Sequence, residues 1–186
     1  VEHPDYSYLA ARIKVNSLHK ETPGFIIATK NLYDDGLLRE EYFKKVMDNA
    51  DAIESIIDYD KDYTFDYFAL TTLIRAYLLK FDNRTIERPQ DLWMRVTLTV
   101  TGNEFNLDKI KETYKSLSSG MYTHATPTLF NSGLKMQQLS SCFLIGMEDD
   151  SIEGIFNTIK DCALISKTAG GIGMHAHNIR GSGSRI

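Results

Sequence analysis

Residues that could do chemistry gather in the last third of the chain. Cys142 follows two serines at the start of an apolar run, residues 139–147, while Lys167 precedes a glycine turn at residues 169–173 and Arg180 follows it. A thiol serves redox chemistry when its surroundings favour the thiolate, and lysine and arginine bind phosphates. Each residue also has an ordinary interpretation, because many cysteines are inert core residues and single cations are usually surface charges.

The glycine turn lies in the wrong order for the common nucleotide-binding fingerprints. In a dinucleotide-binding unit the glycines stand between a strand and the helix whose N-terminus receives the phosphate. Here residues 169–173 follow a predicted helix and precede a predicted strand, and the sequence contains no Walker-type lysine loop. The pattern predicts a glycine C-cap with a close backbone approach. An anionic ligand bound by exposed backbone N–H groups stays open as the alternative.

The segment between Cys142 and the glycine turn predicts an amphipathic helix. We expect Asp150 to cap this helix, with Glu153 completing a capping box. Its apolar stripe consists of Ile152, Ile155, Phe156, Ile159 and Ala163. Such a stripe usually faces the protein's own core, and a helix of a partner subunit is the alternative. With the apolar runs on either side, the pattern predicts a strand–helix–strand unit with buried strands.

Other reactive side chains have ordinary interpretations. Cys162 lies inside the predicted helix and is expected to pack there, and its spacing does not call for a disulfide with Cys142. His175 and His177 would share one face of a strand. Two imidazoles without a thiol or carboxylate give little indication of a metal site, and His124 is expected to be a hydrogen-bonded loop residue. No metal site is predicted.

The residues before this unit predict a helical platform. Apolar residues recur at helical spacing in residues 4–20, 37–46, 50–57, 66–80, 89–100 and 106–117. Residues 25–32 are expected to be a short apolar patch, and residues 121–138, which lack periodicity, an ordered loop. The predicted fold class is α/β overall, with a mainly helical N-terminal domain over residues 1–138 and an α/β domain beginning within residues 139–186.

Composition excludes several classes of protein. The net charge of −4 at pH 7 and pI of about 5.7 give no basic field for nucleic acid. No apolar run approaches the roughly 20 residues of a membrane span, and the polar start is unlike a signal peptide. Two cysteines do not make a disulfide scaffold, which indicates a reducing, cytoplasmic location. The glycine- and serine-rich end, residues 181–186, suggests a flexible segment and a fragment of a longer protein.

Several long motifs occur together and in order. They are Thr123-His-Ala-Thr-Pro-Thr-Leu-Phe-Asn-Ser-Gly133, Gln138-Leu-Ser-Ser-Cys-Phe-Leu144, Asp149-Asp-Ser-Ile-Glu-Gly-Ile155 and Lys167-Thr-Ala-Gly-Gly-Ile-Gly173. Shorter ones are His3-Pro-Asp-Tyr, Leu9-Ala-Ala-Arg-Ile, Glu87-Arg-Pro-Gln and Met94-Arg-Val. Together these motifs resemble the large catalytic subunit of class I ribonucleotide reductase of the eukaryotic type, over essentially the whole chain.

The resemblance implies a fold and a reaction. The family has a helical domain followed by a ten-stranded α/β barrel, which the strand–helix–strand unit would open. It reduces ribonucleoside diphosphates to 2′-deoxyribonucleoside diphosphates by thiol and radical chemistry. Cys142 matches the redox-active cysteine that ends as a disulfide, and Thr126, Ser141 and Gly171 match positions that bind the substrate.

The resemblance also implies an allosteric specificity site for a deoxynucleoside triphosphate. The matching positions are Asp150, Ser151, Ile152, Lys167 and Arg180. In the family a carboxylate binds the sugar hydroxyl and cations bind the phosphates, which suits these charges. The helix over residues 152–167 would lie at a homodimer interface, which accounts for its apolar stripe.

The implied cofactors and partners follow from the same resemblance. No cofactor is bound directly by this chain, Mg²⁺ accompanies the dNTP effector, and a metal-containing small subunit supplies the radical. The partners are ribonucleoside diphosphate substrates, dNTP or ATP effectors, and thioredoxin or glutaredoxin as reductant. We predict no nucleic acid partner and no membrane association.

The chain departs from the full family pattern. It lacks the ATP-cone domain, the radical cysteine with its Asn and Glu partners, the second redox cysteine, the tyrosine relay and the C-terminal cysteine pair. Residues 181–185 also differ from the Ala-Thr-Gly-Ser-Tyr that follows the matching arginine in many members. We therefore expect the isolated chain to be inactive. The alternatives are a nucleotide-binding or dimerisation module without catalysis, a thiol oxidoreductase using Cys142 with Cys162, and a helical scaffold.

Overall fold

The computed structural model describes residues 3–184, and the chain divides into two compact units. Unit 1 consists of the described residues up to His124 together with Leu129–Gln137. Unit 2 consists of Ala125–Thr128 together with the described residues from Gln138 onward. The first two residues, and the last two residues of the predicted flexible end, lie outside the described residues.

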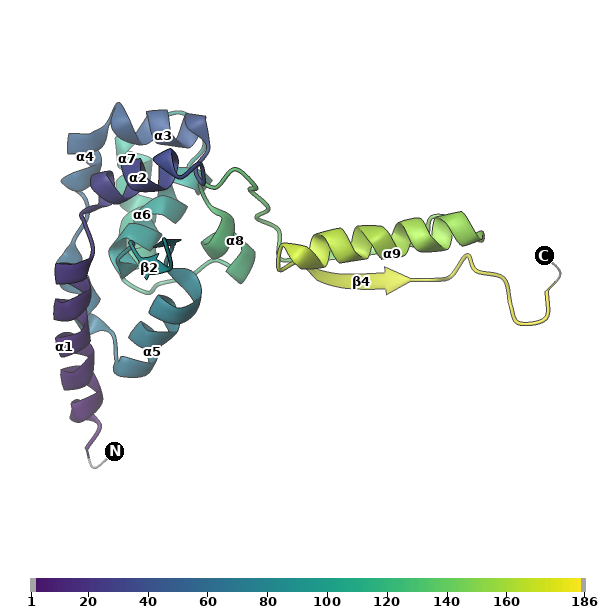
Figure 1. The fold of residues 1–186 in the computed structure, drawn as a ribbon, viewed down its shortest axis with the longest axis horizontal. Coiled ribbons are helices and arrows are strands. Elements are labelled where there is room, and N and C mark those ends of the chain that lie inside the picture. Colours follow the sequence, from purple (N-terminus) through teal and green to yellow (C-terminus); the bar gives the residue numbers. More distant parts are fainter. Residues whose placement is uncertain (1–2, 185–186) are drawn as a thin grey trace. The chain divides into compact units, whose positions relative to one another are not determined.

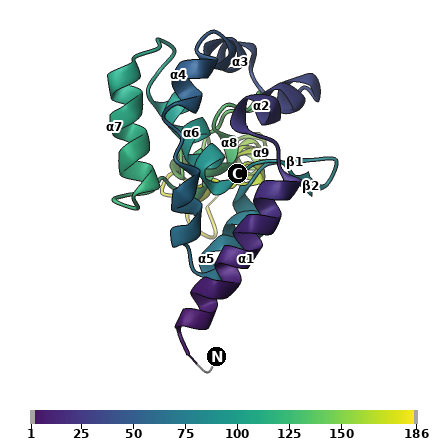
Figure 2. The same cartoon turned by 90° about the vertical axis from the view of Figure 1, so that its left-hand side faces the viewer.

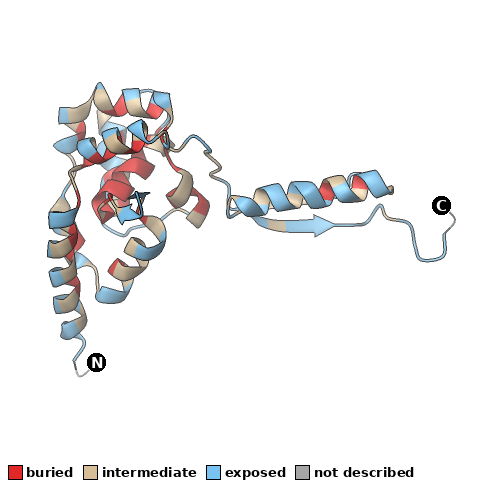
Figure 3. Cartoon of the chain, in the orientation of Figure 1, coloured by how far each residue is buried: buried red, intermediate tan, exposed pale blue. Residues whose placement is uncertain are grey.

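Unit 1 is built from short helices around α6. Its α-helices are α1 (Asp5–Glu21), α2 (Phe25–Asp34), α3 (Glu40–Met47), α4 (Ala50–Glu54), α5 (Tyr67–Thr72), α6 (Pro89–Val100) and α7 (Leu107–Ser118). A 3₁₀ helix (Tyr59–Thr64), a π-helical turn (Leu73–Tyr77) and an antiparallel hairpin of β1 (Lys80–Phe81) and β2 (Arg84–Thr85) lie between them. Figures 1 and 2 show α6 in the middle of the unit, and every residue from Pro89 to Leu98 is buried (Figure 3).

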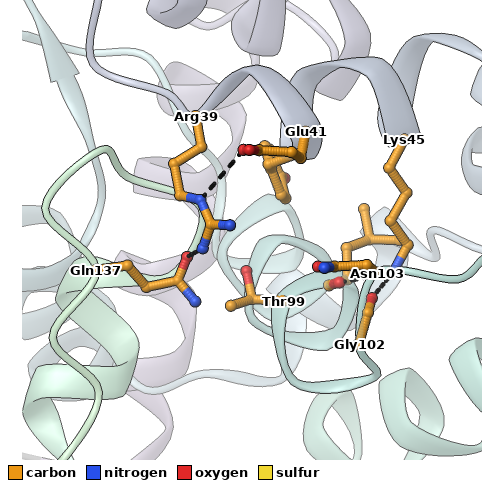
Figure 4. Close-up of a pocket in the computed structure, with 9 residues that line it drawn as sticks. Arg39, Glu41, Lys45, Thr99, Gly102, Asn103 and Gln137 are labelled. Atoms are coloured by element: carbon orange, nitrogen blue, oxygen red, sulfur yellow. Dashed lines mark hydrogen bonds and ion pairs between the residues drawn. The ribbon is translucent and has the colours of Figure 1, made fainter.

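Side chains form hydrogen bonds with backbone groups at both ends of α6. At its start, Asp91 accepts a hydrogen bond from the Arg88 N–H at 2.8 Å, and Pro89 occupies the first turn, where its missing N–H leaves nothing unpaired. At its end, the buried Lys45 ammonium of α3 donates to the carbonyl oxygens of Leu98 at 2.8 Å and Gly102 at 2.6 Å (Figure 4). A cation there complements the negative end of the helix dipole.

A buried ion pair lies at the centre of the same helix. The Arg95 guanidinium pairs with the Glu87 carboxylate, and both side chains are 2% exposed. Glu87 also accepts from the Leu79 N–H at 2.9 Å, and Arg95 donates to the Ser132 carbonyl at 2.8 Å. These contacts satisfy both buried charges, and they link α6 to Leu79, in the segment before it, and to Ser132, 37 residues after Arg95.

Local structure before residue 138 differs from the sequence prediction at several points. The predicted apolar patch is α2, whose buried residues Phe25, Ala28, Thr29 and Leu32 follow helical spacing. The helix predicted over residues 66–80 ends at Tyr77 in the π-helical turn, because the next residues form the hairpin. The loop predicted over residues 121–138 contains α8 (Thr126–Asn131).

Unit 2 contains a parallel strand pair joined by a helix. Strand β3 (Cys142–Gly146) is followed by α9 (Ile152–Lys167) and β4 (Gly171–His175), and the register pairs Cys142 with Gly171 and Gly146 with His175. Helix α9 lies along the pair (Figure 1). The predicted fold class is confirmed, since a mostly helical N-terminal part precedes a parallel strand pair of the kind that begins an α/β barrel domain.

The strands of unit 2 are not buried as predicted. Residues of β3 alternate between exposed and half-buried, and those of β4 are mostly exposed. Within the described part of unit 2, α9 covers one face of the pair and leaves side chains such as Leu144, 92% exposed, on the other. In the range that the structure describes, no helix has the length and apolar content of a membrane span.

The buried Asp91 carboxyl makes the stability of unit 1 depend on pH. Burial raises its pKa to about 7, although hydrogen bonds from the Tyr59 hydroxyl and the Arg88 N–H oppose the shift. A carboxyl whose pKa is higher in the folded than in the unfolded protein stabilises the fold fully below the unfolded pKa of about 4, and loses this contribution as the pH rises through about 7.

We therefore expect Asp91→Asn to flatten the pH dependence of unfolding. The free energy of unfolding of the wild type should fall by about 1–3 kcal/mol more than that of the variant between pH 4 and pH 8. Urea titrations of both proteins at several pH values within this window measure the difference. Parallel pH profiles would contradict the assigned role of Asp91.

Candidate functional site

The starts of the two parallel strands bring the candidate substrate-binding residues and the thiol together. The Ser141 carbonyl accepts a hydrogen bond from the Gly171 N–H at 2.7 Å, and Cys142 is the direct register partner of Gly171. A Cβ atom placed on Gly171 would lie 3.3 Å from the Ser141 carbonyl oxygen and 3.6 Å from the Cys142 sulfur. The glycine therefore lets the β4 backbone lie close to the thiol.

The thiol is accessible in unit 2. Cys142 is exposed and is not in a disulfide, which differs from the buried strand position that the sequence predicts. Cys162 is half-buried and also free. An exposed thiol beside a strand with no side chain at Gly171 can meet a molecule that lies over the strand starts.

Thr126 begins α8 and belongs to the same compact unit as Cys142. Its neighbour Thr128 donates a hydrogen bond from its hydroxyl to the Leu139 carbonyl at 2.9 Å. This contact ties the start of α8 to the segment that leads into β3. Thr126 is thus held in the region upstream of Ser141.

The opposite ends of the strands bring Asp150 and Arg180 together. The Arg180 guanidinium donates to the Asp150 carboxylate and, at 2.9 Å, to the Asp150 carbonyl oxygen. The Arg180 N–H also donates to the carboxylate at 3.3 Å. These residues are 30 positions apart in the sequence, and they meet because β4 runs parallel to β3 and ends beside it. A carboxylate and a guanidinium at one point can bind a molecule that carries hydroxyl and phosphate groups.

The prediction that Asp150 caps α9 is wrong. The N-cap is Ser151, whose hydroxyl accepts from the Gly154 N–H at 3.0 Å. Asp150 is one residue too early to reach the first turn, and its carboxylate pairs with Arg180 instead. Ile152 begins the helix with its side chain 79% exposed.

Residues 147–151, which carry Asp150, are closely packed onto α9. The Glu148 N–H donates to the Thr158 hydroxyl at 3.1 Å. A Cβ atom on Gly154 would lie 2.7–2.8 Å from atoms of Asp149, so only glycine permits this packing. From the other side, the Asn178 amide donates to the Met147 carbonyl at 2.8 Å. Sequence reasoning missed Thr158 and Asn178, because neither interrupts a pattern or belongs to a reactive residue type.

Lys167 does not join Asp150 and Arg180 within one chain. It is the last residue of α9, whereas Asp150 precedes the first, so the two are separated by a helix about 22 Å long at 1.5 Å per residue. Lys167 lies at the end of unit 2 where β4 begins and Cys142 stands.

The apolar stripe of α9 divides into two faces. Gly154 and Thr158 are buried and Ile155 is half-buried on the side that covers the strands. On the outer side of α9, Ile152 is 79% exposed, Phe156 65%, Ile159 49% and Leu164 58%. Because large exposed apolar groups at helical spacing form a surface that favours association, the outer face of α9 is a candidate interface.

The glycine turn does not end α9 as predicted. The residue in the left-handed conformation is Ala169, with a φ of +64°, and not a glycine. Space accounts for Gly170 instead, since a Cβ there would lie 2.7 Å from the Ile165 side chain and 3.2 Å from the Ile165 carbonyl oxygen. The predicted close backbone approach therefore describes Gly170 correctly.

His175 ends β4 and His177 lies in the turn beyond it, so the two do not share a strand face as predicted, but they contact each other. The Nδ1 atoms of His175 and His177 are 2.6 Å apart, so one imidazole donates to the other. Among the described residues, no group of three or more His, Cys, Asp or Glu side chains could hold a metal ion. His124 is half-buried, and its Nε2 atom is buried without a hydrogen-bond partner.

Two family models match the chain in order. The model of the ribonucleotide reductase all-alpha domain matches residues 63–137, and that of the ribonucleotide reductase barrel domain matches residues 140–186. The relatives include the ribonucleoside-diphosphate reductase large chain 2 of Saccharomyces cerevisiae, the large chain of Schizosaccharomyces pombe and the large subunit of Arabidopsis thaliana. Each is 46% identical over 99–100% of this chain.

This chain spans about a quarter of the length of these relatives. The matches cover 22% of the Saccharomyces cerevisiae protein and 24% of the other two. They extend over both compact units of the chain.

Gly154→Ala tests the packing of residues 147–151. In an ordinary helix this change stabilises by about 1 kcal/mol, but here the new Cβ meets the Asp149 backbone at 2.7 Å. We expect the free energy of unfolding to fall by about 1–3 kcal/mol instead, measured by denaturant titration.

Ala163→Gly, at an exposed position of the same helix, is the matched control and should cost only about 1 kcal/mol through helix propensity. A rise in stability for Gly154→Ala would contradict the close approach.

Proposed function

Because this chain belongs to the family of ribonucleotide reductase large subunits, we propose that it contributes to the reduction of ribonucleoside diphosphates to 2′-deoxyribonucleoside diphosphates. Residues 1–138 would be a helical domain and residues 139–186 the beginning of a ten-stranded α/β barrel. The single observation that carries the proposal is the exposed Cys142 thiol at the paired starts of β3 and β4, beside the Gly171 backbone.

Cys142 would act as one of two redox thiols. In the overall reaction two thiols give up two hydrogen atoms and form a disulfide. The C2′–O bond of the ribose breaks, one hydrogen leaves with the hydroxyl as water, and the other replaces it on C2′. Cys142 supplies one thiol, and its exposure supports transfer to a bound sugar and later re-reduction by thioredoxin or glutaredoxin. The second thiol would come from a part of the enzyme other than this chain.

The substrate would bind over the strand starts. Ser141 immediately precedes Cys142, and Gly171 bonds to Ser141 and pairs with Cys142, which supports contacts with the sugar and phosphates of a diphosphate. Thr126 would bind from α8, which Thr128 anchors to Leu139. The missing side chain at Gly171 leaves room for the substrate against the backbone.

A deoxynucleoside triphosphate, with Mg²⁺, would bind at the other strand ends as a specificity effector. Asp150 would accept the hydroxyl of the sugar, Arg180 would bind phosphates, and Ser151 and Ile152 would lie beside the ligand. The convergence of Asp150 and Arg180 supports this site. The two side chains bind each other, so a nucleotide that pairs with both would replace that contact.

Lys167 would belong to the same kind of site through a second copy of the chain. The position of Lys167 at the far end of α9 supports this arrangement. If two α9 helices packed antiparallel about a twofold axis, Lys167 of one copy would approach Asp150 of the other. The exposed side chains of Ile152, Phe156 and Leu164 support a homodimer interface on α9.

The proposal includes partners outside this chain. A metal-containing small subunit would supply the radical, and ATP or dNTPs would act as effectors. Because the thiol needs these parts, we propose that the isolated chain is inactive. Nucleotide binding and dimerisation without any turnover in the full-length gene product would instead favour a regulatory module.

The effector site is tested by measuring the binding of dTTP with Mg²⁺ to the full-length gene product. Arg180→Gln should weaken binding by about tenfold or more, because a charged hydrogen bond to phosphate contributes about 1.5–3 kcal/mol. Asp150→Asn should weaken it as well, through loss of the carboxylate acceptor. Equilibrium dialysis gives the dissociation constants, and sedimentation shows whether dimerisation follows occupancy.

Arg75→Gln is the matched control, because Arg75 is an exposed arginine of unit 1. The dissociation constant of this variant for dTTP should stay within about twofold of the wild-type value. Binding that survives both Asp150→Asn and Arg180→Gln would show that the effector site lies elsewhere.

Cys142→Ser tests the redox role. Turnover of ribonucleoside diphosphate by the full-length gene product with its small subunit should fall by more than about a thousandfold, while dTTP binding stays unchanged. Cys162→Ser is the matched control and should retain activity, because Cys162 lies in the middle of α9. Loss of activity in both variants would favour a Cys142–Cys162 dithiol instead.

A further inference from the structure

We propose that Thr158 and Asn178 are positioning residues of the nucleotide site, setting where Asp150 stands relative to Arg180. This inference rests on the proposed effector site and extends it to residues that would not touch the ligand. It follows from how residues 147–151 are held. Almost every residue in that segment has a specific contact with α9 or with the residues that follow β4.

Thr158 fixes the segment from the helix side. Its side chain lies on the buried face of α9 and the residue is 2% exposed. Its hydroxyl donates to the Gly154 carbonyl at 2.8 Å and accepts from the Glu148 N–H at 3.1 Å. Without this hydroxyl, the Glu148 N–H would lose its partner in a half-buried place, at a cost of about 1–3 kcal/mol. The segment would then move to find another acceptor.

Asn178 fixes the same segment from the strand side. Its amide donates to the Met147 carbonyl at 2.8 Å. The Met147 N–H in turn donates to the His175 carbonyl at 3.0 Å, one step beyond the last register pair of the sheet. Asn178 therefore extends the pairing of the two strands past their ends, up to the residues that carry Asp150 and Arg180.

The two contacts hold neighbouring residues, Met147 and Glu148, immediately before Asp149 and Asp150. Asn178 also stands two residues before Arg180. Gly154 adds to this restraint, because the Asp149 backbone packs directly against it. The segment between the two contacts and Asp150 is thus too short to absorb a shift, and loss of either contact would move the carboxylate relative to the guanidinium.

Such a shift would change the contact between Asp150 and the sugar of a nucleoside triphosphate. The distance between the sugar hydroxyl and the phosphates is set by the ligand, so a carboxylate and a guanidinium that are held in place bind both ends without reorganisation. Displacement of Asp150 would weaken the hydroxyl contact first and leave the phosphate contact with Arg180 largely intact. The predicted defect is therefore a loss of selectivity for the hydroxyl.

The experiment compares dTTP with its analogue that lacks the 3′-hydroxyl, 2′,3′-dideoxythymidine triphosphate, both with Mg²⁺, on the full-length gene product. The wild type should bind dTTP about tenfold more tightly than the analogue, because the analogue cannot donate the charged hydrogen bond from its 3′ position to the Asp150 carboxylate. Thr158→Val should reduce this ratio towards one. Thr158→Ser keeps the hydroxyl and is the matched control, which should restore the wild-type ratio.

Asn178→Leu provides a second route to the same result. Asn178 is exposed, so this variant should fold even where Thr158→Val does not, and its ratio should also fall towards one. If a residue only stabilised the fold, its substitution would lower the affinity for both ligands equally. The ratio of the two dissociation constants would then stay unchanged.

The outcomes separate the two proposals. If the wild type prefers dTTP and both Thr158→Val and Asn178→Leu keep that preference, the positioning role is overturned and the effector site stands. If the wild type does not distinguish the two ligands, or binds neither, the proposed effector site fails and the positioning role fails with it.

Discussion

The parallel pairing of β3 and β4 is the constraint on which both candidate sites depend. A helix that connects two parallel strands must return the chain to the side from which it set out. The two strand starts are therefore neighbours, and so are the two strand ends. This geometry puts Cys142 beside Gly171 at the strand starts and Asp150 beside Arg180 beyond the strand ends. Neither pair is close in the sequence, and the length of α9 keeps the two pairs apart.

Unit 1 depends on a different constraint, the burial of charged groups in α6 and at Glu87, two residues before it. Arg95, Glu87 and Asp91 are all nearly inaccessible to solvent, and each has hydrogen-bond partners from other segments. Such groups are costly to bury unless all their partners are in place. The ion pair and its partners therefore require α6, the segment before β1 and the residues after α8 to be correctly arranged together.

Much of the fold could be predicted from local patterns, and the candidate sites only in part. Helices α6 and α9 were predictable because Pro89 and the apolar spacing mark them. Short α8 was not, because six residues carry too little periodicity. The residue types and the family resemblance indicated Asp150 and Arg180. The helix cap is Ser151, one residue after the predicted cap, and a sequence pattern does not place a helix start to within one residue. The contacts of Thr158 and Asn178 arise only when distant segments pack, so no sequence window contains them.

The buried Lys45 ammonium has a consequence for reactivity. Burial lowers the pKa of this amine, and nearby Lys109 lowers it further, so more of it is neutral than of an exposed lysine at the same pH. Its nitrogen donates to two carbonyl oxygens at the end of α6, so a reagent must displace these hydrogen bonds before it can react with the amine. Separation of α3 from α6 would release the amine. The rate at which an acylating reagent labels Lys45 would therefore report how often this end of α6 opens.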